Sequence, residues 1–249
     1  MAGHSKFKNI MHRKGAQDKK RAKIFSRLGR EISVAVKEGG PDPEKNIRLR
    51  SAIGSAKSLN MPKDNIERAV KKGEGNDPDS NYEEVRYEGY GPDGVAIIVE
   101  ALTNNKNRTA AEVRSTFSKY GGNLGETGSV SFGFKRLGSI TLYKSNINEE
   151  ELFDYIVENG SEDYEIIDEE YNIYCDQKTL HHLNQKVIEK FGPTNFTGLI
   201  WKCENDIAVS KDKADKLFKL LNMLEENEDV QAVSSNFDVS DDLLASLTG

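Results

Sequence analysis

The residues with the clearest chemical potential are the cations and histidines at the start of the chain. Four cations come first, in a segment with little apolar content: Lys6, Lys8, Arg13 and Lys14. Lys and Arg neutralise phosphates and release condensed counterions, so this arm could become ordered on a phosphate backbone. His4 and His12 could add hydrogen bonds to the same phosphates. Phe7 is the one aromatic residue in the arm, which argues against a platform for base stacking.

A second group of cations lies on a predicted helix, residues 18–38. Ile24, Leu28 and Ile32 recur at four-residue spacing and form one apolar stripe. The opposite side of this helix is cationic: Lys19, Lys20, Lys23, Arg27, Arg30 and Lys37. We expect that side to be open to solvent and to extend the phosphate-binding surface of the arm.

Charge is divided unevenly along the chain. Residues 1–75 hold 19 Lys/Arg and 8 Asp/Glu, whereas the remainder holds 16 Lys/Arg and 33 Asp/Glu, although the net charge of the whole chain is −6. A basic N-terminal segment on an otherwise acidic chain predicts that this segment has a polyanionic partner. The alternative is that the basic segment docks on the acidic part of its own chain. The acidic part could serve solubility, or it could face a basic protein.

Other patterns do not predict catalysis or a cofactor. The string from Gly89 to Gly94 matches G-x-G-x-x-G, but a predicted strand follows it where dinucleotide binding needs a helix, so we interpret it as a turn. His181 and His182 are adjacent and point apart on a predicted helix, which does not suit a metal site. Cys175 and Cys203 fit buried residues better than nucleophiles. The sequence therefore predicts a non-enzymatic protein with no cofactor and no metal.

Location follows from what the sequence lacks. The two cysteines have no C-x-x-C spacing, no stretch is long enough for a membrane helix, and no apolar signal segment begins the chain. We expect a cytoplasmic protein with no membrane partner, whose oligomeric state the sequence does not specify.

Residues 1–80 are predicted to form a basic three-helix bundle. The second helix is expected to begin at the Asp42-Pro43 cap, and the third near Pro62. Residues 74–80 are rich in Gly, Asn, Asp and Pro and form a natural linker.

The rest of the chain predicts two small α/β domains, which makes the fold α+β. Residues 137–204 alternate as βαββαβ, the ferredoxin-like order. The flanking segments, 81–136 and 205–240, are predicted to form one discontinuous domain into which the ferredoxin-like domain is inserted. Within it, a capping box at Thr109 and Glu112 should open a helix, and residues 129–134 should form a strand.

The chain also resembles a known family. The matching segments are residues 1–10, 12–14, 16–18, 23–25, 30–32, 60–66, 68–69, 87–92, 105–109, 121–125, 128–132 and 235–238. They are similar to the YebC/PmpR family of bacterial regulators, which has a mitochondrial relative that activates translation of cytochrome oxidase. Departures are modest: Phe7 stands where the family usually has Trp, Gly15 replaces a more usual Ala, and residues 201–204 lack a common proline.

The resemblance implies a three-domain α/β protein with a helical N-terminal bundle. It implies a regulator of transcription that binds DNA. Alternatively, it implies a translation factor that binds ribosomal or messenger RNA on the ribosome and relieves stalling or activates translation. The contacts that it implies for nucleic acid are His4, Lys6, His12, Arg13, Lys14, Lys19, Lys20 and Lys23. Lys8, Arg27 and Arg30 join this set because of their charge and position alone.

Overall fold

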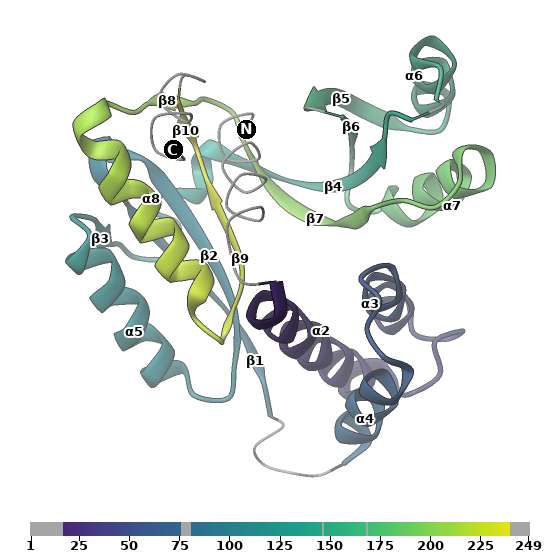
Figure 1. Cartoon of the computed structure of the whole chain (residues 1–249), viewed down its shortest axis with the longest axis horizontal. Helices are drawn as coiled ribbons and strands as arrows, with labels where there is room; N and C mark the ends of the chain where they lie inside the picture. Colours follow the sequence, from purple (N-terminus) through teal and green to yellow (C-terminus); the bar gives the residue numbers. More distant parts are fainter. Residues whose placement is uncertain (1–16, 76–80, 146, 168, 240–249) are drawn as a thin grey trace.

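The computed structural model describes residues 17–75, 81–145, 147–167 and 169–239. Three helices form a head, which we define as α2 (Gln17–Gly39), α3 (Ile47–Ser58) and α4 (Lys63–Glu74). Everything from β1 to β10 forms the body. Figure 1 shows the head beside the lower end of the body, with α2 next to β9. The fold is α+β, as the sequence predicts.

The head is held together by the apolar stripe of α2. Ile32, Ala35 and Val36 pack against a core from α3 and α4 that includes Leu49 and Ile66, and Phe25 and Leu28 pack at its margin. Ser33 and Val34 are buried as well, so α2 is covered all round at this turn. A helix with only one packed stripe would keep its other side in water. The body covers part of the other side, because Arg27 contacts Glu225 and Arg30 contacts Asp229.

The second helix of the head starts later than its sequence suggests. The side chain of Asp42 accepts a hydrogen bond from the backbone N–H of Glu44, within a short turn. Asn46 is the true N-cap, because its Oδ1 accepts from the backbone N–H of Leu49 at 3.0 Å. Its Nδ2 donates to the carbonyls of Ala35 and Gly40, which adds tertiary contacts that Asp42 does not make.

The first sheet of the body has the strand order β3-β1-β2-β9. Its strands are β1 (Glu83–Tyr90), β2 (Ala96–Thr103), β3 (Asn123–Leu124) and β9 (Val230–Ser235). The β1–β2, β1–β3 and β2–β9 pairings are all antiparallel. Two helices, α5 (Lys106–Lys119) and α8 (Lys211–Glu226), cover one face of this sheet (Figure 1). Short strands β8 (Ile207–Ala208) and β10 (Phe237–Asp238) pair in parallel beside it.

The second sheet has the strand order β5-β6-β4-β7. Its strands and helices follow one another as β4 (Phe134–Tyr143), α6 (Glu149–Glu158), β5 (Ser161–Ile167), β6 (Glu170–Cys175), α7 (Leu180–Phe191) and β7 (Phe196–Cys203). This is the predicted βαββαβ order. Strands before and after this segment share the first sheet, although the exact boundaries at 80, 136 and 204 stay a prediction.

Trp201 joins the two sheets. The guanidinium groups of Arg86 and Arg136 both lie over its ring, with their central carbon atoms 5.0 and 5.1 Å from the ring centroid. It also packs on a small core of Ala96, Ile98, Val130 and Phe134. Such cation–π contacts stabilise the junction in addition to the burial of apolar surface.

Two local predictions in the body are wrong: the strand at residues 129–134 and the capping box at Thr109. In each case a buried carboxylate accepts hydrogen bonds from the residues involved. Residues 129–134 do not form one strand, because the backbone N–H groups of Val130 and Ser131 donate to the buried carboxylate of Glu88. They lead into a short 3₁₀ helix (Ser131–Gly133) before β4. Helix α5 is capped by Asn105, whereas Thr109 is buried and donates to Asp229.

Candidate nucleic-acid interface

The arm predicted to bind phosphate lies outside the described residues. This applies to His4, Lys6, Lys8, His12, Arg13 and Lys14. Lys19 and Lys20 belong to α2, but their side chains also lie outside what the structure describes. The structure places three of the predicted contacts in full: Lys23, Arg27 and Arg30.

These three residues form what we call the docked face of α2, because they meet the corner where α8 leads into β9. Lys23 Nζ lies 3.3 Å from Glu226 Oε2. Arg27 donates from Nη2 to the carbonyl of Glu225. That carbonyl belongs to the last turn of α8, where helix carbonyls lack intrahelical partners and the dipole favours cations. The cations of α2 therefore cap the C-terminus of α8.

Arg30 completes the docked face by reaching a buried carboxylate. Arg30 Nη1 lies 3.0 Å from Oδ1 of Asp229, whose side chain is 4% exposed. The other oxygen of Asp229 accepts from Thr103, Thr109 and Arg108 at 3.0, 2.7 and 2.6 Å. Burial raises the pKa of Asp229, but the hydrogen bonds from Arg108, Thr109 and Thr103 outweigh it and hold that pKa below its ordinary 3.8. Asp229 thus stays ionised as an anchor for the head.

The docked face differs from the prediction that this side of α2 is open to solvent. Lys23 and Arg30 have side chains that are 20% and 16% exposed, and Arg27 is half-buried. Burial lowers the pKa of Lys23 in spite of the attraction of Glu226. In this conformation the three cations are engaged by the protein's own acceptors, as in the alternative that the sequence left open.

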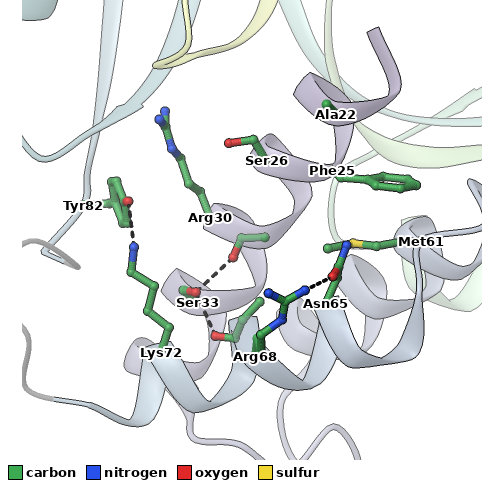
Figure 2. A pocket seen from close by; sticks show the side chains of 12 residues that line it. Ala22, Phe25, Ser26, Arg30, Ser33, Met61, Asn65, Arg68, Lys72 and Tyr82 are labelled. Carbon is green, nitrogen blue, oxygen red and sulfur yellow. Dashed lines mark hydrogen bonds between the residues drawn. The ribbon is translucent and has the colours of Figure 1, made fainter. Parts of the chain in front are cut away.

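A groove between α2 and α4 offers a different cationic surface (Figure 2). Its volume is about 580 Å³. The α2 side consists of Ala22, Phe25, Ser26, Gly29, Arg30 and Ser33. The other side consists of Met61, Asn65, Arg68, Ala69, Lys72 and Tyr82. The charged residues in this lining are Arg30, Arg68 and Lys72, and all are cations, although the whole chain carries a net charge of −6.

Arg68 and Lys72 are exposed and lie one turn apart on α4. Arg68 donates to the side chain of Asn65, and Lys72 Nζ lies 3.3 Å from the hydroxyl of Tyr82. Among the described residues neither forms an ion pair with a carboxylate. Arg21, at the α2 end, lies over the ring of Phe25 and is exposed in the same way. These cations remain available to an external anion.

The sequence analysis did not single out Arg68 and Lys72 as candidate site residues. Arg68 enters the sequence analysis only within the family-matching segment 68–69, and Lys72 only within the predicted third helix. The available signal was spacing: Asn65, Arg68, Ala69 and Lys72 follow the i, i+3, i+4, i+7 pattern of one helix face. That face mixes cations with small and amide residues, which is unusual for a face that only packs.

Other candidate sites give no competing chemistry. Within the described ranges, no group of three or more His, Cys, Asp and Glu could hold a metal ion. Burial raises the pKa of both Cys175 and Cys203 to about 11, which is opposite to what an activated thiol needs. Of the string from Gly89 to Gly94, the first two residues end β1 and the remaining four form the turn to β2, with no helix after it. No described helix is long and apolar enough to cross a membrane.

Fold and site together define an α+β protein in which a basic helical head is docked on an acidic body. The model of the TACO1/YebC protein N-terminal domain matches residues 5–76, and that of the TACO1/YebC second and third domain matches residues 82–237. The chain belongs to the TACO1/YebC family. It is also similar to a solved structure, the conserved hypothetical protein Aq1575 from Aquifex aeolicus. The two are 45% identical, with a TM-score of 0.83 over 89% of this chain and 91% of that one.

Proposed function

We propose that this protein is a non-enzymatic regulator that binds nucleic acid through its basic head. One observation carries the proposal: Arg68 and Lys72 at the groove, and Arg21 over the ring of the groove residue Phe25, are exposed and have no carboxylate partner among the described residues. In a chain of net charge −6, cations left open in this way attract a polyanion. The arm and the first turn of α2 add Lys6, Lys8, Arg13, Lys14, Lys19 and Lys20, with His4 and His12 beside them.

The salt dependence of binding tests this proposal. The full chain is titrated against a short labelled duplex and a short single strand over a series of salt concentrations. We expect the slope of log affinity against log salt to fall by about 0.9 per lost duplex contact when Lys20, Arg21, Arg68 and Lys72 are replaced by Ala. A matched control replaces four exposed cations of the body: Lys119, Lys178, Lys211 and Lys216. If both variants keep the slope of the unaltered protein, the head is not the binding surface.

Two physiological targets are compatible with a basic head. Our first candidate is DNA, with a role in regulation of transcription in the cytoplasm of a bacterial cell. The second is messenger or ribosomal RNA, with a role in translation. The acidic body favours the second, because it could meet basic ribosomal proteins while the head meets RNA. Sedimentation of cell extracts separates the two: comigration with ribosomes, without preference for any promoter fragment, would exclude the first candidate.

A further inference from the structure

The α2–α4 groove has two chemically different ends. Phe25 and Met61 lie together at one end, and Arg30, Lys72 and Tyr82 lie at the other (Figure 2). Arg68 and Asn65 lie along the α4 rim. The groove therefore joins an apolar, aromatic end to a cationic end.

The floor of the groove is open because α2 carries small residues there. Ala22, Ser26, Gly29 and Ser33 follow one another at helical spacing along the side that faces α4. The hydroxyl of Ser33 lies 2.9 Å from the carbonyl of Gly29 and 2.8 Å from that of Ala69, which fixes the two helices at the floor. A methyl group added at Gly29 would lie 3.9 Å from Cβ of Ala69, so there is room for little more than a methyl group at that point. The groove therefore exists because the side chains of α2 that face α4 are small, while the hydrogen bonds of Ser33 hold the two helices together.

Size and charge together select the ligand class. A volume of about 580 Å³ falls within the ordinary range of small-molecule sites, and it is too small for a duplex. Reading a duplex through its major groove uses a helix or a two-stranded ribbon that enters the groove of the nucleic acid. Here α2 and α4 form the walls of a groove in the protein. In a single strand, by contrast, an unstacked base is free to leave the backbone and lie against an aromatic side chain.

We propose that the α2–α4 groove binds one unstacked nucleotide of a single-stranded nucleic acid. Its phosphate is held by Arg68 and Lys72, and its base lies against Phe25 and Met61. Arg30 contributes less to the phosphate, because Asp229 already binds it at 3.0 Å. The inference rests on the proposed function and deepens it by naming the form of nucleic acid.

The experiment measures fluorescence anisotropy of the full chain with labelled single-stranded RNA, single-stranded DNA and duplex DNA of one length and sequence. We expect the unaltered protein to prefer a single strand over the duplex by at least about tenfold. Two groove variants are compared: Arg68→Ala with Lys72→Ala, and Ser26→Leu, which fills the floor and leaves every charge. The matched control is Lys57→Ala with Lys71→Ala, two exposed head cations outside the groove.

Both groove variants should abolish the preference for single strands, whereas the control should lower single-strand and duplex affinity by the same factor. Loss of two single-strand contacts should reduce the salt slope by about 1.4, and Ser26→Leu should leave the slope unchanged. The RNA and DNA arms identify which single strand is preferred. Thermal denaturation verifies that each variant is folded.

Failure of this inference is distinct from failure of the proposed function. If the protein binds nucleic acid but has no preference for single strands, or if the groove variants weaken both forms equally, the groove is not a nucleotide site and the proposed function stands. If the protein binds no nucleic acid at any salt concentration, the proposed function and the groove inference are both wrong.

Discussion

The docked face of α2 and the α2–α4 groove both carry cations, and these cations have opposite roles. On the docked face, Lys23, Arg27 and Arg30 meet carbonyls and carboxylates at the α8–β9 corner. At the α2–α4 groove, Arg68 donates to the side chain of Asn65 and to the backbone carbonyl of Asp64, and Lys72 contacts the hydroxyl and ring of Tyr82. Neither cation pairs with a carboxylate among the described residues. A cation stabilises the fold where carbonyl or carboxylate acceptors that need a hydrogen-bond donor face it. Where no such acceptor faces it, the cation remains available to an external anion. Number of cations alone is therefore a poor guide to the binding surface.

The largest effect on this comparison is expected from Asp229→Ala. The substitution removes the carboxylate that Arg30, Arg108, Thr103 and Thr109 share. Because it leaves buried partners without an acceptor, we expect the free energy of unfolding to fall by about 3–5 kcal/mol. Urea denaturation monitored by circular dichroism measures this loss.

The pH dependence of stability tests whether the effect of Asp229→Ala comes from the ionised carboxylate. Its pKa in the folded protein is lower than the ordinary 3.8, so its contribution to stability is present above about pH 4 and is lost as the pH falls through the folded pKa. The difference in stability between the unaltered protein and Asp229→Asn should therefore shrink in acid. A difference that stays constant down to the lowest pH would contradict the role of the ionised carboxylate.

A smaller loss of stability is expected from Arg30→Ala. Arg30 belongs both to the docked face and to the lining of the groove. The substitution removes one charge-assisted hydrogen bond to Asp229 and one to the carbonyl of Glu228, and a bond of this kind contributes about 1.5–3 kcal/mol to the free energy of unfolding. Asp229 keeps Arg108, so the loss should be less than that of Asp229→Ala. Urea denaturation and single-strand binding are measured on the same samples. A loss of affinity as large as that of Arg68→Ala with Lys72→Ala would show that Arg30 binds phosphate more than it binds the body.

The smallest effect is expected from the pair Lys23 and Glu226. Their side chains are 20% and 53% exposed, and the ion pair is screened by water and salt. A double-mutant cycle with Lys23→Ala and Glu226→Ala should give a coupling energy of about 0.2–1 kcal/mol that decreases with added salt. A coupling energy well above this range would mean that the docked face, and not Asp229 alone, anchors the head.

The sequence by itself determined the helices of the head, the βαββαβ order of the second sheet and the division of charge. These features depend on local periodicity and on neighbours within a few residues, which a single chain displays directly. Prediction from the sequence was wrong where residues distant in the chain determine the local structure. Asn46, and not Asp42, caps the second helix, because its side chain also donates to the carbonyl of Ala35. The carboxylate of Glu88 accepts hydrogen bonds from the backbone N–H groups of residues 130 and 131, which prevents a continuous strand there.

Only the tertiary structure decided which cations are open. The same periodicity that places Lys23, Arg27 and Arg30 opposite the apolar stripe of α2 cannot reveal that the end of α8, some 200 residues away in sequence, supplies acceptors for them. Nor can it reveal a groove between α2 and α4, because its volume depends on how two helices pack and on the small residues that meet there. Long-range proximity sets both outcomes, and proximity is a property of the folded chain.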